Sequence, residues 1–180
     1  AYILLDVSGS MDYGQGGQVT KFQYGCLLTA CLAYLMSRQQ DTVGVVAFDS
    51  RIRLHLPPAS SPAHMDRVFT GLERLTCGKR TAIAQTFHEL AERIAKRGLI
   101  VIISDLYDEP AEVLRALQHF CYKKHQLIIF HTFDPAELEL PFRRITNLVD
   151  LESNQKLQVD PPLVRQAYQR EINDFIERYR

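Results

Sequence analysis

Three oxygen-bearing side chains follow the first apolar run of the chain at alternate positions. Residues 2–5 have the composition of a buried strand, and the chain continues directly into Asp6, Ser8 and Ser10. In an extended segment, alternate side chains point to the same side. Carboxylate and hydroxyl oxygens are hard ligands, which suit a hard cation such as Mg2+. These residues therefore predict a divalent-cation site at the end of a strand.

Two further oxygen ligands are expected from distant parts of the chain. Thr81 follows a glycine-containing turn and opens an amphipathic segment, and Asp105 follows the apolar run 99–103. Ligands of open α/β sheets bind at the carboxyl ends of the strands, so both side chains are expected at the same edge as the first three. Thr76 and Thr86 are the alternatives to Thr81.

The elements that must position these residues alternate along the chain. Apolar spacing predicts helices over about 21–38, 64–75, 81–96, 110–122 and, after a cap at Asp160, 160–180. Strands are predicted at 2–6, 42–48, 51–56, 99–103, 126–133 and 146–151, with Pro57 and Pro58 ending the third. This alternation predicts an α/β fold: a doubly wound, mostly parallel six-stranded sheet with one antiparallel edge strand and helices on both faces, as in Rossmann-like folds.

Composition limits the classes of function. The chain has 180 residues, enough for one domain over 1–180, and its 21 basic residues balance 21 acidic ones. This balance argues against nucleic-acid binding through bulk charge. No segment is apolar over enough residues to predict a membrane span. The chain begins at Ala1, already inside a predicted strand, so we expect it to be the C-terminal part of a longer protein.

Cysteines and histidines give no metal-ligand spacing. The four cysteines form no CxxC pair and lie among apolar residues, which indicates a reducing compartment and hence a cytoplasmic protein: Cys26, Cys31, Cys77 and Cys121. The six histidines are expected to be ordinary core or surface residues: His55, His64, His88, His119, His125 and His131.

The pattern Asp6-x-Ser8-x-Ser10, with Thr81 and Asp105 far along the chain, resembles the metal-ion-dependent adhesion site of von Willebrand factor type A (VWA) domains. Essentially the whole chain also resembles one bacterial branch, the uncharacterised family associated with MoxR-type AAA+ ATPases (domain of unknown function fifty-eight). The segments that carry this resemblance are 21–24, 41–48, 97–105, 134–141 and 150–152. The chain differs from many VWA domains directly before the threonine, where Lys79 and Arg80 stand in place of glycine.

The resemblance implies a non-enzymatic module for metal-dependent protein–protein interaction. Mg2+ or Mn2+ would be held by a ligand set of five: Asp6, Ser8, Ser10, Thr81 and Asp105. One coordination position would stay open for an Asp or Glu carboxylate of a partner protein. The implied partner is a MoxR-type AAA+ ATPase or a client of that ATPase.

Two other functions remain open on the residues alone. An aspartate at a strand end near Mg2+ can form an aspartyl phosphate, so Asp6 could be the nucleophile of a Mg2+-dependent phosphohydrolase. Enzymes of the haloacid-dehalogenase type carry a second aspartate two residues later, where this chain has Ser8. The domain could also be a metal-free scaffold in which Asp6, Ser8 and Ser10 only form a turn.

Overall fold

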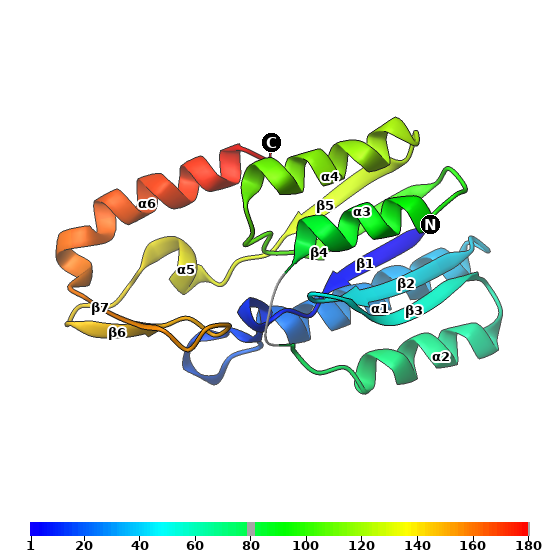
Figure 1. The fold of residues 1–180 in the computed structure, drawn as a ribbon. Helices are drawn as coiled ribbons and strands as arrows, with labels where there is room; N and C mark the ends of the chain where they lie inside the picture. Colours follow the sequence, from blue (N-terminus) through cyan, green and yellow to red (C-terminus); the bar gives the residue numbers. More distant parts are fainter. Residues whose placement is uncertain (79–81, 180) are drawn as a thin grey trace.

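A computed structural model describes residues 1–78 and 82–179. Its central sheet contains five strands: β1 (Tyr2–Asp6), β2 (Val43–Phe48), β3 (Ile52–Ala59), β4 (Leu99–Ser104) and β5 (Gln126–His131). Their order across the sheet is β3-β2-β1-β4-β5, and all are parallel except β3, which runs antiparallel to β2 at one edge (Figure 1). The predicted mostly parallel α/β fold is confirmed.

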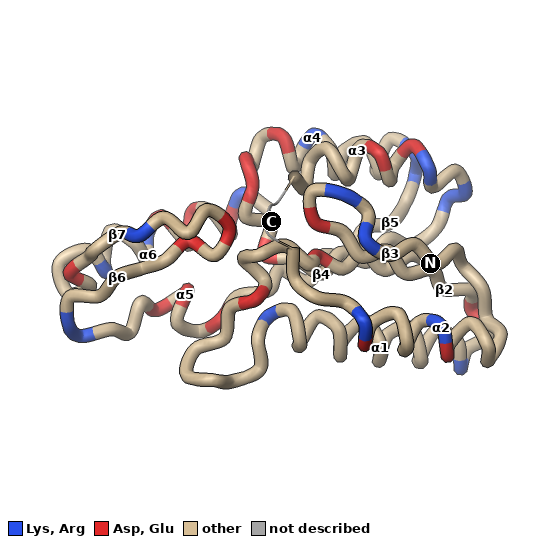
Figure 2. The backbone as a smooth tube through the Cα atoms, turned by 60° about the horizontal axis from the view of Figure 1, so that its bottom comes forward, with Lys and Arg blue, Asp and Glu red and all other residues tan. Residues whose placement is uncertain are grey.

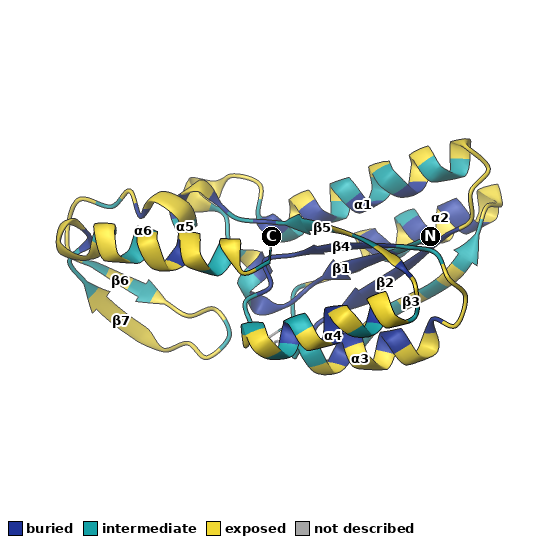
Figure 3. Ribbon diagram, turned by 90° about the horizontal axis from the view of Figure 1, so that it is seen from above, coloured by how far each residue is buried: buried dark blue, intermediate teal, exposed yellow. Residues whose placement is uncertain are grey.

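Helices pack on both faces of this sheet. Six α-helices are described: α1 (Lys21–Arg38), α2 (Pro62–Glu73), α3 (Ile83–Arg93), α4 (Pro110–Tyr122), α5 (Pro135–Glu139) and α6 (Pro161–Glu177). Residues of α1 and α2 share one apolar cluster with Ile3 and Leu5, whereas residues of α3 and α4 share another with Leu4 and Ile102. The central strands β1, β2 and β4 are therefore buried between two helical layers, whereas the edge strands β3 and β5 are partly exposed (Figure 3).

The strand β1 lies at the centre of the sheet because its side chains are apolar on both faces. Ile3, Leu4 and Leu5 are all fully buried. A strand that is apolar on both sides belongs in the interior of a parallel sheet. The carboxyl end of β1, and with it Asp6, is thus fixed between β2 and β4.

The strand predicted over 146–151 does not join the central sheet. The segment Thr146–Val149 forms β6, but it pairs with β7 (Lys156–Val159) in a separate antiparallel ribbon and does not join β5. The turn between them is held by Asp150, whose carboxylate accepts hydrogen bonds from the Glu152 amide and the Ser153 hydroxyl. A local hairpin closes at a lower entropic cost than a long-range pairing, and the sequence analysis missed β7 entirely.

The prediction that Pro57 and Pro58 end the third strand was also wrong. Strand β3 continues through both prolines to Ala59. Proline cannot donate to a ladder, but an edge strand leaves one side of its backbone unpaired, and β3 is the edge strand. Most helix predictions agree with the structure within a few residues, and the helices 21–38 and 110–122 agree to the residue.

The helix α6 and the β6–β7 ribbon extend beyond the carboxyl ends of the strands (Figures 1 and 3). Near its C-terminal end α6 packs against the core, where Phe175 contacts the rings of Tyr107 and His131. Within the described residues, no helix has both the length and the apolar character needed to cross a bilayer.

Candidate metal centre

The loop after β1 places two hydroxyls and one carboxylate together. Ser8 is extended, but Gly9–Asp12 form a 3-10 turn, so the prediction that the loop is extended through Ser10 was wrong. The turn nevertheless brings the Ser8 and Ser10 hydroxyl oxygens to 3.0 Å from each other. Asp6 Oδ1 accepts a hydrogen bond from the Ser8 amide at 2.8 Å, which holds the start of the loop.

Asp6 is fully buried, and both of its oxygens are hydrogen-bonded. The Ser104 hydroxyl, at the end of β4, donates to Asp6 Oδ2 at 2.5 Å and accepts from the Leu106 amide at 2.9 Å. Burial, together with the charge of nearby Asp105, raises the pKa of Asp6 to about 7 from the usual 3.8, although its hydrogen bonds to Ser104 and Ser8 oppose this effect. The sequence analysis did not single out Ser104.

Asp105 is also fully buried, and its partner is a buried lysine. Lys21, the first residue of α1, places its Nζ 2.7 Å from Asp105 Oδ2 and 2.7 Å from Glu137 Oε1. The same ammonium lies 5.0 Å from the centre of the Tyr107 ring. A cation in the first turn of a helix interacts unfavourably with the helix dipole. The position of Lys21 is therefore a sequence signal that its ammonium pairs with a carboxylate elsewhere in the fold.

The ion pair connects the end of the sheet to the C-terminal elements. Glu137 belongs to α5, where it forms a capping box with Asp134. The Tyr168 hydroxyl of α6 donates to the Glu137 carbonyl oxygen at 2.5 Å. Burial raises the pKa of the Glu137 carboxyl, although Lys21 opposes the effect. Figure 2 shows acidic residues in the loops between the sheet and α5.

Thr81, together with Lys79 and Arg80, lies outside the described residues. The preceding segment does reach the centre: the Gly78 amide donates to the Val7 carbonyl oxygen at 2.6 Å. Of the two alternatives, Thr86 is buried on α3 and donates to the Asp49 carbonyl oxygen, and Thr76 is exposed.

A cavity of about 540 Å³ borders the centre on the side of the β6–β7 ribbon. Ser10, Tyr107 and Glu137 line it on the side of the centre. Its remaining walls are mostly apolar or aromatic and include Tyr13, Leu140, Phe142, Leu148, Leu151 and Tyr168. The turn of the ribbon also touches the centre, since a Cβ on Gly9 would lie 3.3 Å from the Leu151 carbonyl oxygen.

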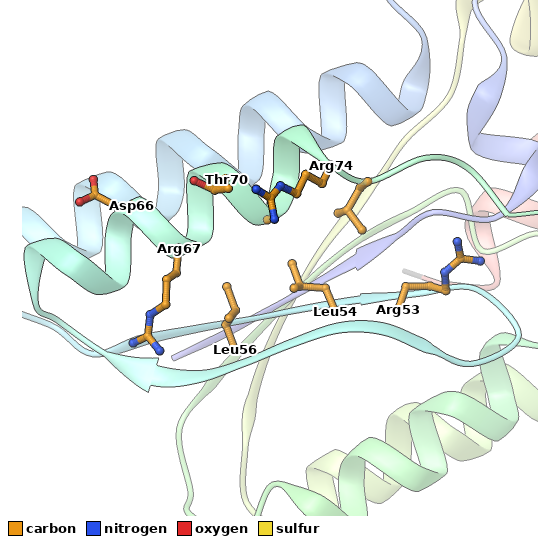
Figure 4. A pocket seen from close by; sticks show the side chains of 9 residues that line it. Arg53, Leu54, Leu56, Asp66, Arg67, Thr70 and Arg74 are labelled. Atoms are coloured by element: carbon orange, nitrogen blue, oxygen red, sulfur yellow. The ribbon is translucent and has the colours of Figure 1, made fainter.

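A second cavity, of about 480 Å³, lies between β3 and α2 and has a different character (Figure 4). Leu54 and Leu56 form its floor, and Arg53, Arg67 and Arg74 surround it. None of the candidate ligands that the structure describes lines it. The centre at the ends of β1 and β4 therefore remains the candidate site.

The donor set around Asp6 fits a hard cation. Carboxylate and hydroxyl oxygens are the ligands of Mg2+, which usually keeps several waters and takes only one or two carboxylates from the protein. Across residues 1–78 and 82–179, no group of three or more His, Cys, Asp or Glu side chains is arranged to hold a metal. A cation at this centre would therefore depend on the hydroxyls of Ser8 and Ser10.

Comparisons with known proteins give a family and a fold. A family model described as "Protein of unknown function DUF58" matches residues 1–177. The curated proteins contain no match. An aerotolerance-related membrane protein from Bacteroides fragilis, carrying multiple mutations to serine, superposes with a TM-score of 0.64 at 19% identity, covering 96% of this chain and 87% of that one. The conserved hypothetical protein BatB from Bacteroides thetaiotaomicron also gives a TM-score of 0.64, at 18% identity, covering 95% and 83%.

Proposed function

The chain belongs to the DUF58 family, and we propose that it is a non-enzymatic, metal-dependent protein-interaction module of the VWA type. One observation carries the proposal: Asp6, Ser8 and Ser10 gather at the carboxyl end of the central strand, next to Asp105 at the end of β4. The fold, shared with the BatB-like proteins, is consistent with this assignment.

In this proposal the ion is Mg2+ or Mn2+, held by Asp6, Ser8, Ser10 and Asp105, with Thr81 as the fifth ligand. The bound ion would supply a Lewis-acidic position that accepts an external carboxylate. The burial of Asp6 and Asp105 near each other supports the presence of a cation, because two neighbouring carboxylates repel one another in a medium of low dielectric constant. Lys21 offsets only part of this charge, since it also pairs with Glu137.

The partner in this proposal is a protein that offers an Asp or Glu side chain to the ion. The cavity of about 540 Å³ beside Ser10 supports this, because it could take an apolar side chain next to the partner's acidic residue. The MoxR-type AAA+ ATPase, or its client, is proposed as partner from the family resemblance alone. Since metal and partner would share one coordination sphere, each should strengthen the binding of the other.

The phosphohydrolase is the less favoured candidate. Asp6 has no exposed surface, and its two carboxylate oxygens accept hydrogen bonds from Ser8 and Ser104. A nucleophile must reach its substrate, whereas a buried carboxylate can act on a metal or order a loop. This burial supports a binding role for Asp6.

A thermal-shift titration with Mg2+ and Mn2+ tests the metal site. The wild type should show a saturable rise in melting temperature, and Asp6→Ala should show none. Asp12→Ala is the matched control, because Asp12 is an exposed carboxylate on the same turn. At a hundred times the dissociation constant the ion would add ~2.7 kcal/mol, which corresponds to roughly 5–10 °C for a domain of this size.

A pulldown with the cognate MoxR-type ATPase then tests the interaction. We expect capture in Mg2+ that is lost in EDTA and in Asp6→Ala and is retained by Asp12→Ala. Capture that is indifferent to both EDTA and Asp6→Ala would contradict a metal-mediated contact. Absence of any metal-dependent thermal shift and of any metal-dependent capture would favour the metal-free scaffold.

A further inference from the structure

Two histidines from neighbouring helices face each other on the outer surface formed by α3 and α4. His88 of α3 and His119 of α4 place their Nδ1 atoms 3.3 Å apart, and their ring centres are 5.5 Å apart. His88 is exposed and His119 is half-buried, so the pair is open to solvent. The residues lie 31 positions apart in the chain, which is why sequence spacing gave no sign of them.

The distance between the two nitrogens matches the separation of two nitrogen ligands bound to one metal ion. Zn2+ binds imidazole nitrogen at about 2.0–2.1 Å in tetrahedral geometry, which separates two nitrogen ligands by about 3.3 Å. A hydrogen bond from an N–H donor is usually shorter, at about 2.7–3.2 Å. At 3.3 Å the two nitrogens form a long hydrogen bond in the metal-free protein, and the same spacing fits two ligands of one tetrahedral ion.

A carboxylate orients one of the rings. Glu92, one turn after His88 on α3, places its Oε1 2.8 Å from His119 Nε2. A proton on Nε2 then donates to Glu92 and leaves the lone pair of Nδ1 directed away from the carboxylate. Lys123 holds the other oxygen of Glu92 at 3.2 Å. Metal-bound histidines in proteins almost always donate their second nitrogen to a carboxylate or carbonyl in this way.

We propose that His88 and His119 form a second metal site, which takes a transition-metal ion of the Zn2+ class through two Nδ1 atoms and joins α3 to α4. Glu92 is a positioning residue that fixes the His119 tautomer. No third His, Cys, Asp or Glu ligand completes the site within the described part of the chain. Two positions of the ion are therefore left to water or to a side chain of another molecule. Imidazole ligands favour Zn2+ and Cu2+ over Mg2+, so this site differs in chemistry from the centre at Asp6.

The test is a Zn2+ titration by calorimetry, with Co2+ absorption as a report on tetrahedral geometry. The background carries Cys31→Ser and Cys121→Ser, because both thiols are exposed and could bind zinc themselves. Millimolar Mg2+ is present throughout to saturate the centre at Asp6. The variants are His88→Ala, His119→Ala and Glu92→Gln, and the matched control is His55→Ala, an exposed histidine of β3.

We expect one zinc ion per chain in the background protein and in His55→Ala. Each of His88→Ala and His119→Ala should weaken binding at least ~10-fold, and Glu92→Gln should weaken it ~10–100-fold. Asp6→Ala should bind zinc with unchanged affinity, so this result tests the histidine site independently of the proposed Mg2+ centre. No zinc binding in the background protein, or equal binding in His88→Ala, would overturn the site. Unchanged affinity in Glu92→Gln would overturn its positioning role.

Discussion

Replacing Asp6 with Asn should stabilise the metal-free protein at alkaline pH, although Asp6 is buried and hydrogen-bonded. Burial and the charge of Asp105 raise the pKa of Asp6 to about 7 from the usual 3.8. A carboxyl whose pKa rises on folding favours the folded state while it is protonated, and this contribution is lost as the pH rises from about 4 to about 7. At about 1.4 kcal/mol per pKa unit, a charged Asp6 at pH 8 costs the folded state at most roughly 4 kcal/mol.

Asparagine can keep both hydrogen bonds while removing the charge. Its amide oxygen can accept a hydrogen bond from the Ser8 amide. In the wild type the Ser104 hydroxyl donates to the Asp6 carboxylate, and in the variant the asparagine amide nitrogen can instead donate to the Ser104 hydroxyl oxygen. Urea denaturation in EDTA at pH 5 and pH 8 measures the effect. We expect the free energy of unfolding of Asp6→Asn to exceed that of the wild type by ~2–4 kcal/mol at pH 8, with a smaller difference at pH 5.

The comparison between the two proteins isolates Asp6, because all other titrating groups are common to both. A variant less stable than the wild type at pH 8 in EDTA would refute the reasoning, as would a difference that is the same at both pH values. Adding Mg2+ should then stabilise the wild type alone, because the variant lacks the carboxylate that offsets the charge of the ion.

Two further substitutions test the contacts around the centre. Lys21→Met should lower the free energy of unfolding by ~3–5 kcal/mol in urea denaturation, because it leaves Asp105 and Glu137 as buried carboxylates without their cation; a loss below ~1 kcal/mol would show that the pair is solvated. Gly78→Ala should lower the free energy of unfolding by ~1–3 kcal/mol, because the new Cβ would clash with the Asp49 carboxylate. A variant as stable as the wild type would mean that Asp49 can move aside.

Local sequence patterns predicted most of the fold. The apolar runs of β1, β2 and β4 identify buried parallel strands, and the apolar run of β5 identifies the partly exposed parallel strand at the edge. The β6–β7 ribbon was mispredicted because Thr146–Val149 has the alternation of an edge strand, which is the same in a hairpin and in a larger sheet. Only the partner strand distinguishes the two, and β7 is short and mostly exposed.

The candidate centre was predicted in part. Strand ends give the positions of Asp6 and Asp105, because chain topology brings the carboxyl ends of parallel strands together. Local patterns do not encode contacts between distant side chains, so Ser104 and Glu137 were missed, and the position of Lys21 in the first turn of α1 was a signal that the sequence analysis did not use. The assignment of Asp6, Ser8, Ser10, Thr81 and Asp105 as metal ligands stays a prediction from sequence.

The buried lysine changes what a metal would do at this centre. Lys21 already supplies one positive charge to Asp105, so the metal-free fold does not depend on a divalent ion for that carboxylate. Asp6 has only hydrogen-bond donors and no cation of its own among its described contacts. A divalent ion would thus gain most of its binding energy from Asp6 and the serine hydroxyls, and the ammonium near Asp105 would weaken its affinity. A partner's carboxylate would add a ligand at the open coordination position of the ion, and this contact would offset part of the lost affinity. We therefore expect a cation to bind at this centre more tightly in the presence of such a partner than in its absence.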